Sequence, residues 1–398
     1  MIPYAVLLAE VLLFYWRVLF APSVYAIPWD LRYYHLPLAE FMAASYRAGE
    51  LPLWDPWTYC GFPYFANVTA QFFYPPTIVT VLLSNLEGGG RLLYFLEVQL
   101  VAHVLLAGAG MYRLLRRLEA GPAAAILGAT VYQLGPFFAS QAQHIGAINA
   151  AAWLPLAFLA VVERRIAMLA ASLAMAILAG FPAVAASSVV ACGMLAAALV
   201  ALGRAPVKTF ATLAAGVAWA GLLAAAQVFP TMQLTRLSVS KYRGDWLDTG
   251  GGMPLQSLIS LALPNYYGSF QFNGTTWNLP WNPTWLYLYV GIGGLACVAA
   301  ALGNRRAAPY GIVTLLGSLW MLGDNTPVGR GVFAVLPEIV KAPLYAEYAL
   351  PIYSAGMAVL AGLGAQRLMG ARPAALQAAA VAVVAGELIA VGSGRPMN

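Results

Sequence analysis

Long apolar stretches alternate with short polar connections along most of the 398-residue chain. A helix crosses a bilayer when roughly 17–25 consecutive residues are apolar, and about eleven segments approach or reach that length. The pattern therefore predicts an all-helical polytopic membrane protein, folded as a single transmembrane domain over residues 1–398. The predicted spans are residues 2–21, 91–112, 123–139, 146–162, 166–181, 183–202, 208–229, 284–302, 308–322, 345–366 and 373–391.

Two long polar and aromatic segments, 22–90 and 230–283, interrupt this pattern and are predicted to be extracytoplasmic loops. Loops of this length are usually functional or disordered, and their Trp, Tyr, Pro and Asn content favours an ordered surface layer. Within the first loop, Pro37 to Arg47 predicts a short interfacial helix that stops at Gly49. The run 73–86 is too short to cross a bilayer and opens on two prolines, so we expect it to be re-entrant or interfacial.

Composition and charge support the same class. The chain is 61% hydrophobic and 9% charged, far from the globular average. Short cytoplasmic loops of membrane proteins collect Lys and Arg. If 73–86 does not cross, the basic connections fall on one side, which places the N-terminus in the cytoplasm and the C-terminus outside. The net charge of +6 is then a topology signal and predicts no nucleic-acid partner. The residues that carry it are Arg113, Arg116, Arg117, Arg164, Arg165, Arg204, Lys208, Arg305, Arg306, Arg367 and Arg372.

The first loop contains a series of short motifs: Asp30, His35-Leu36-Pro37, Gly49 to Pro56, Gly61-Phe62-Pro63, Asn67, Gln71 and Phe73 to Pro76. The series resembles the first outer loop of YfhO-type bacterial membrane proteins of the GT-C glycosyltransferase superfamily. The likeness continues, in order, through Gly135 to His144, Ala152 to Leu156, Gln227 to Pro230, Leu263 to Gly268, Tyr287 to Gly291 and Gly323 to Pro327.

The resemblance implies a GT-C-like fold in the bacterial plasma membrane. It also implies a hexosyl- or pentosyltransferase that moves a sugar from a polyprenyl-phosphate carrier to an extracytoplasmic acceptor, which is a cell-envelope polymer, a lipid or a protein. The catalytic group would be Asp30. The chemistry asks for such a residue independently, because an acceptor hydroxyl is a weak nucleophile until a carboxylate removes its proton.

Other residues of the chain are candidates for supporting roles. Asp55 is a second candidate catalytic carboxylate that would orient the acceptor. The leaving lipid phosphate needs a cation or a divalent metal ion, for which we favour Lys341, in a Val-Lys-Ala-Pro string that resembles the family's basic element, over Arg236, Lys241 and Arg243. The candidate substrate-binding residues are Tyr34, His35, Trp54, Asn67, Gln71, Tyr74, His144 and Lys341.

The chain departs from the family pattern in three places. Tyr345 stands where a second basic residue is common, and Gly180-Phe181-Pro182-Ala183 replaces a Gly-His-Pro-Gln-like turn. Relatives usually continue into a large extracytoplasmic domain, whereas this sequence stops soon after its last predicted span. These departures favour a donor with different anchoring or a diminished enzyme.

Structural roles compete with the functional ones. Asp30 precedes a helical segment and could cap it, and Asp55 before Pro56 could start a turn. Asn67 and Gln71 could bind their own loop backbone, and a lone histidine such as His35 or His144 is often structural.

Two other functions compete with the transferase. A transporter or lipid flippase would explain the many spans and the prolines within them, but it needs carboxylates at mid-bilayer, whereas most here lie at the outer rim. A scaffold protein that has lost its chemistry is the third hypothesis. Four charged residues lie within predicted spans: Glu10, Arg17, Glu97 and Glu387. We expect them to face the bundle interior and pair with other helices.

Overall fold

The computed structural model describes residues 1–238, 252–268, 284–335, 345–393 and 395. Over these residues the protein is all-helical, with seventeen α-helices, a few short 3₁₀ or π turns and no β-sheet. The helices are α1 (Ile2–Phe14), α2 (Trp16–Phe20), α3 (Leu36–Arg47), α4 (Pro75–Leu86), α5 (Leu92–Arg117), α6 (Pro122–Leu134), α7 (Ile145–Ala151), α8 (Leu154–Glu163), α9 (Ile166–Leu178), α10 (Pro182–Ala201), α11 (Thr209–Leu223), α12 (Ala225–Leu237), α13 (Ile292–Ala301), α14 (Ala308–Leu322), α15 (Pro327–Val335), α17 (Leu350–Met369) and α18 (Ala374–Gly392).

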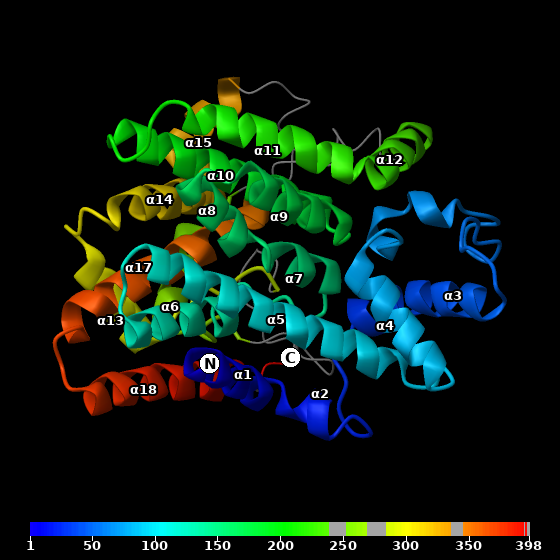
Figure 1. Ribbon diagram of the computed structural model, residues 1–398, viewed down its shortest axis with the longest axis horizontal. Helices are drawn as coiled ribbons and strands as arrows, with labels where there is room; N and C mark the ends of the chain where they lie inside the picture. The colour runs from blue at the N-terminus through cyan, green and yellow to red at the C-terminus, as the bar shows by residue number, and fades with distance from the viewer. Residues whose placement is uncertain (239–251, 269–283, 336–344, 394, 396–398) are drawn as a thin grey trace.

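Several of these helices are long and apolar enough to span a membrane. Five segments of the described chain meet that standard: α5, α7 with α8, α10, α17 with the turn before it, and α18. The bent pair α11 and α12, whose axes differ by 76°, would make a sixth. The protein is therefore a multi-pass membrane protein, and Figure 1 shows most of its helices side by side between two ends.

The basic connections gather at one end of the bundle. Residues from the α5–α6, α10–α11 and α13–α14 connections line one pocket. Arg367, at the end of α17, donates to the carbonyls of Ala300 and Leu302 at the end of α13. Gln366 accepts a hydrogen bond from the Gly121 amide before α6. This end lies opposite the first loop in Figure 1, as the alternation of basic and polar connections predicts.

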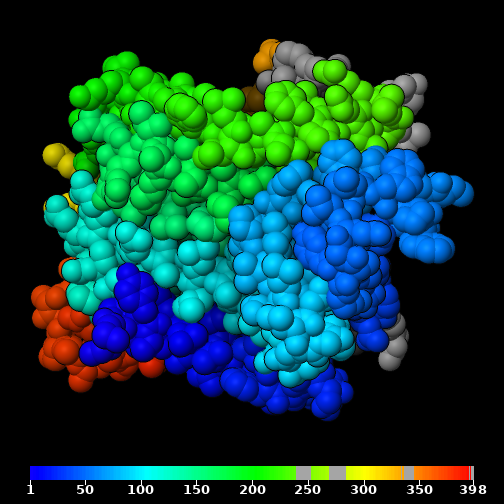
Figure 2. Space-filling view, turned by 45° about the vertical axis from the view of Figure 1, so that its right-hand side comes forward, coloured from blue at the N-terminus to red at the C-terminus, as the bar shows by residue number. Residues whose placement is uncertain are grey.

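The first loop forms the other end. Asp30 precedes a π-helical turn, Leu31–His35, and α3 follows directly. The predicted helix Pro37–Arg47 is confirmed, with Pro37 in its first turn and Gly49 after its end at φ +75°. Figure 2 shows the loop meeting the α12 segment, where Gln227 Nε2 donates to the Phe65 carbonyl at 3.1 Å.

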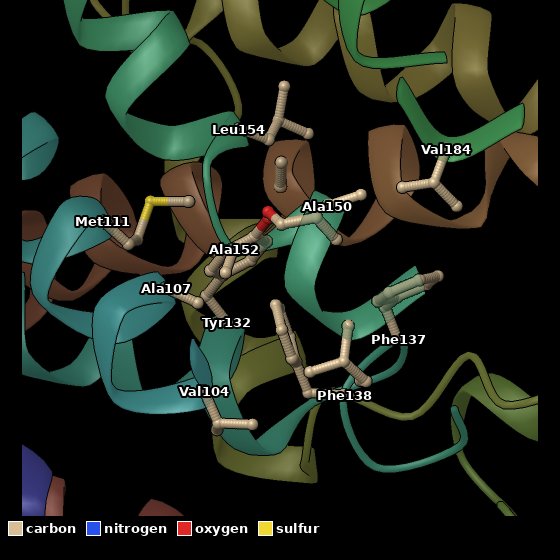
Figure 3. Packing of buried hydrophobic residues seen from close by; sticks show 14 of the residues in the cluster. Val104, Ala107, Met111, Tyr132, Phe137, Phe138, Ala150, Ala152, Leu154 and Val184 are labelled. Atoms are coloured by element: carbon tan, nitrogen blue, oxygen red, sulfur yellow. The ribbon is translucent and has the colours of Figure 1, made fainter. Parts of the chain in front are cut away.

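One continuous hydrophobic cluster runs through the bundle. Figure 3 shows Tyr132, Phe137 and Phe138 packed among the small side chains of α5 and α7. Helices α6 and α17 come close together because their contact surface is made of small residues. A Cβ on Gly128 would lie only 2.8 Å from the Ala358 carbonyl oxygen, the kind of approach that glycine allows between membrane helices.

The charged residues within the helices pair with other elements, as predicted. Glu10 in α1 accepts hydrogen bonds from Thr130 and Gln133 of α6, at 2.8 Å each. Arg17 donates to the Ser393 carbonyl at 2.8 Å. These contacts join separate elements of the bundle. The hydrogen bonds to the buried carboxylate of Glu10 offset its lost hydration.

The other two acids bind backbone amides. Glu97 in α5 accepts from the Ile27 amide at 2.7 Å, which fixes the start of the first loop. Glu387 in α18 accepts from the Ile292 amide at 2.7 Å and from the Tyr289 hydroxyl. Because Ile292 is the first residue of α13, this carboxylate lies at the positive end of that helix.

Several predicted spans differ from the structure, and the span 208–229 bends by 76° between α11 and α12. Residues 2–21 contain a break at Tyr15 between α1 and α2. The predicted span 284–302 is helical only from Ile292, and residues 286–291 are buried without regular secondary structure. The Leu288 carbonyl in that segment accepts from the Tyr353 hydroxyl at 3.0 Å. This hydrogen bond satisfies one carbonyl that has no helical partner.

Candidate functional site

Asp30 is the first residue of the candidate site. Its Oδ2 lies 3.2 Å from Nε2 of His144, and its side chain is 53% exposed. Asp30 precedes the π-helical turn but makes no side-chain capping bond to it. The capping role is therefore absent, and the carboxylate pairs with a histidine from another part of the fold.

His144 is oriented by the turn that precedes α7. Its Nδ1 lies 2.7 Å from Oε1 of Gln141, and the amide nitrogen of Gln141 donates to the Thr284 carbonyl. The Thr284 carbonyl can only accept, so the nitrogen of the Gln141 amide points towards it and the oxygen points towards His144. Because that oxygen also can only accept, Nδ1 of His144 must carry a proton. The remaining nitrogen, Nε2, faces Asp30. The amide nitrogen of Gln143 lies 3.4 Å from the same Nε2.

The charge on Asp30 follows from its surroundings. The hydrogen bond from His144 is the main reason that the pKa of Asp30 lies below its usual value, and charge on His144 and His35 acts in the same direction. Partial burial opposes them. Asp30 is therefore ionised at neutral pH and can accept a hydrogen bond from a hydroxyl.

His35 lies in the π-helical turn beside these two residues, and 8% of its surface is exposed. Burial lowers its pKa to about 4, and His144 adds to this effect. His35 is thus neutral at pH 7 and supplies no positive charge to a phosphate. Its ring contacts that of Tyr34, with centroids 5.2 Å apart.

An aromatic cluster surrounds His144. Trp285 stacks on the imidazole with ring centroids 6.0 Å apart, and Phe181 lies 6.1 Å from it. Tyr348 contacts both Trp285, at 5.3 Å, and Phe181, at 5.8 Å. Tyr345 extends the cluster through Tyr348. Trp285 is buried, whereas Phe181, Tyr345 and Tyr348 are half-buried and leave part of their rings open.

Asp55 has a local partner for each of its oxygens. Oδ1 accepts from the Trp57 amide at 2.9 Å, and Oδ2 accepts from the Thr58 hydroxyl at 2.5 Å. The backbones of Asp55 and Phe62 pair in both directions at 2.8 Å. These bonds form the turn that Asp55 before Pro56 favours. Trp54 covers the same turn, because a Cβ on Gly61 would meet its ring at 2.6 Å.

Asn67 and Tyr34 are joined through one threonine. Asn67 Oδ1 accepts from the amide and the hydroxyl of Thr69, at 3.1 and 2.6 Å. That hydroxyl is 2.7 Å from the Tyr34 hydroxyl. Asn67 thus caps the 3₁₀ turn Val68–Ala70 and also fixes Tyr34 beside the site.

Gln71 and Tyr74 lie beneath the loop and are buried. Oε1 of Gln71 accepts from Thr77 at 2.5 Å, and its side chain packs under Gly180, next to Phe181. A Cβ on Gly180 would lie 2.7 Å from Cγ of Gln71. The Tyr74 hydroxyl is 2.6 Å from Nε2 of His103 and accepts from Trp153 at 3.0 Å. Both residues therefore support the loop from below.

The proposed phosphate-binding residues have different outcomes. Lys341, Lys241 and Arg243 lie outside the described residues. Arg236 is exposed in the last turn of α12. In the described part of the chain, no group of three or more His, Cys, Asp or Glu side chains is placed to hold a metal ion.

The structure thus brings Asp30, Tyr34, His35 and His144 together and places Trp54 and Asp55 in a turn of their own. Sequence reasoning missed Gln141, which orients His144, and Trp285, which stacks on it. Gln141 belongs to the string Gly135 to His144, so that motif carried the signal. Trp285 left no signal in the sequence, because its contact is long-range.

Comparisons of the chain with family models, with curated proteins and with solved structures gave no match.

Proposed function

We propose that the protein is a glycosyltransferase that moves a sugar from a polyprenyl phosphate to an acceptor at the end of the bundle formed by the first loop. The observation that carries the proposal is the contact between Asp30 and His144, 3.2 Å long and partly open to solvent. It provides a carboxylate for proton transfer and an imidazole beside it. The sequence resemblance leads to the same residue, Asp30.

The chemistry needs one proton acceptor and one stabilised leaving group. The oxygen of the acceptor hydroxyl attacks the anomeric carbon while its proton passes to Asp30. The bond between that carbon and the phosphate oxygen breaks, and the electron pair leaves with the lipid phosphate. The side chain next to Asp30 is the imidazole of His144, which is the group best placed to contact the leaving phosphate. A single displacement of this kind inverts the anomeric configuration.

The aromatic cluster fits a sugar substrate. Phe181, Tyr345 and Tyr348 are half-buried and contact one another or His144. Aromatic rings offer flat apolar surfaces, against which the C–H face of a sugar ring can pack. Phe181 and Tyr345 are also the positions at which the chain departs from the family pattern. The sugar or its anchoring should therefore differ from that of relatives with histidine or a basic residue at these positions.

The proposal includes a topology. About eleven segments would cross the bacterial plasma membrane, with the N-terminus in the cytoplasm and the C-terminus outside. The end that carries Arg117, Arg204 and Arg306 would then be cytoplasmic, and Asp30 would face the lipid-linked donor and the extracytoplasmic acceptor.

A transporter or lipid flippase is the second candidate, and the 76° bend between α11 and α12 favours it. Broken helices line the substrate sites of many transporters. The carboxylates within the helices support the transferase instead. Glu10, Glu97 and Glu387 are bound to neighbouring side chains or amides, and such pairing suits a structural role.

The two functions predict different products. The purified full-length protein would be reconstituted in vesicles with a panel of polyprenyl phosphates, each carrying a different radiolabelled sugar. Bacterial envelope lipids would serve as acceptors. A transferase yields label in a new lipid or polymer and releases the free polyprenyl phosphate. Movement of intact labelled donor across the bilayer without cleavage of its sugar bond would identify a flippase and contradict the proposal.

A further inference from the structure

A small polar pocket lies at the opposite end of the molecule from Asp30. Its volume is about 340 Å³, and three arginines, Arg117, Arg204 and Arg306, line it together with Tyr310. These residues come from three different connections, so the pocket exists only in the folded bundle. Nothing in the proposed transferase reaction uses it.

The pocket carries an excess of positive charge. Arg306 pairs with Glu119 at 2.6 Å, and Arg117 pairs with Glu163 at 3.2 Å. Arg204 has no ion pair among the described residues. Two of the three arginines of the pocket therefore have an acidic partner, and the guanidinium of Arg204 with its N–H donors is available for an anion.

Tyr310 provides an independent sign of a ligand. It is 1% exposed, and its hydroxyl has no hydrogen-bond partner within the described structure. Tyr310 and the three arginines line the same pocket. A buried hydroxyl without a partner is unfavourable. An oxygen acceptor among the arginines would satisfy it.

The start of α14 favours the same kind of ligand. The helix begins at Ala308 without a side-chain cap, and residues of its first turn, Pro309 and Tyr310, line the pocket. The amino end of a helix carries partial positive charge and attracts phosphate oxygens. Arginine, a free phenol and a helix start together match a tetrahedral oxyanion.

We propose that this pocket binds a phosphate group. In the proposed topology the pocket lies at the cytoplasmic membrane surface, where basic pockets between membrane helices bind the headgroups of anionic lipids. The chemistry is shared by a phospholipid headgroup and by free phosphate. Arg204 supplies the unpaired charge and Tyr310 the buried donor.

The test is native mass spectrometry of the full-length protein in detergent, titrated with phosphatidylglycerol, phosphatidylcholine or inorganic phosphate. We compare wild type with Arg204→Gln and Tyr310→Phe. The matched control is Arg113→Gln, an exposed arginine in α5 at the same end that does not line the pocket. Melting temperatures of all variants, measured in the same detergent, show that the fold is kept.

We expect Arg204→Gln to weaken binding about tenfold, as the loss of a charge-assisted hydrogen bond does, and Tyr310→Phe to weaken it less, while Arg113→Gln binds like wild type. Sensitivity of phosphatidylglycerol binding alone identifies the ligand as a lipid headgroup, and sensitivity of inorganic phosphate binding identifies free phosphate. Equal losses for Arg113→Gln and Arg204→Gln, or no binding of either anion by wild type, would overturn the proposal.

Discussion

Asp30 Oδ2 lies 3.2 Å from His144 Nε2, although the two residues come from the first loop and from the turn before α7. The pair links the first loop with the string Gly135 to His144, the two parts of the sequence that contain the candidate residues Asp30 and His144. Because Gln141 fixes the protonated nitrogen of His144, the imidazole can act on Asp30 in only one orientation. His144 is therefore a positioning residue for Asp30.

Replacing His144 tests this role. His144→Gln removes the hydrogen bond and the charge that lower the pKa of Asp30, so the pKa should rise towards its ordinary value. Because only ionised Asp30 accepts the proton, the acid limb of the pH profile of sugar transfer should move to higher pH. The rate at neutral pH should fall roughly tenfold or more, the usual effect of losing a hydrogen bond to a charged group. An unchanged acid limb would contradict the coupling.

Stability should depend on the protonation of His35. Its pKa is lowered from 6.5 to about 4 in the folded protein, so between these values the unfolded chain binds the extra proton. Above pH 6.5 His35 is neutral in both states and does not affect stability, whereas from pH 6.5 down towards 4 protonation of the unfolded chain lowers the free energy of unfolding. From pH 6.5 to 5 this amounts to roughly 2 kcal/mol.

Thermal melts at several pH values would measure it. We expect the melting temperature of His35→Gln to fall less steeply between pH 6.5 and 5 than that of wild type, because glutamine does not titrate. Parallel slopes for the two proteins would mean that His35 is already charged in the folded state.

Asp55 should contribute to the stability of the fold and not to catalysis. Its two oxygens bind Trp57 and Thr58 of its own turn. Asp55→Ala should lower the free energy of unfolding by about 1–3 kcal/mol, because the turn loses both acceptors. Asp55→Asn keeps one acceptor and should retain most of the transfer activity. Loss of transfer by a stable Asp55→Asn protein would restore the catalytic role that the sequence suggested.

Gly180 should control the position of the aromatic cluster. Its φ is +91°, and a Cβ there would lie 2.7 Å from Cγ of Gln71. Gly180→Ala should therefore destabilise the protein by about 1–3 kcal/mol and displace Phe181, the next residue, with a loss of transfer. Gly311→Ala in α14 is the control, since no atom lies within 4 Å of its Cβ position. Melting temperature and transfer rate are measured together, and equal behaviour of the two variants would contradict the packing role.

Much of the fold could be predicted from local patterns. The helix over Pro37 to Arg47 was predicted from a proline at its start and a glycine after its end, both local signals. Glu10 was expected to face other helices, and it does. The non-helical segment 286–291 was predicted as part of a helix, because a short buried apolar run does not reveal its conformation by its pattern alone.

The site was less predictable for a physical reason. Asp30 was found from its motif, but its partner His144 is far away in sequence, and no local pattern indicates such a contact. The structural roles of Asn67 and Asp55 were foreseen as alternatives because their bonds are local. The aromatic cluster around His144 joins residues from three distant segments, so only the folded chain reveals it.

The most direct measurement compares wild type with Asp30→Asn for both donor binding and transfer of radiolabelled sugar in a single turnover. The substitution keeps the volume of the side chain and removes the oxygen that accepts the proton. We predict that the variant folds and binds the donor but loses transfer by a factor of about a thousand, within the range for a general base. Transfer at the wild-type rate by a folded Asp30→Asn protein would contradict the assignment of Asp30 as the catalytic base.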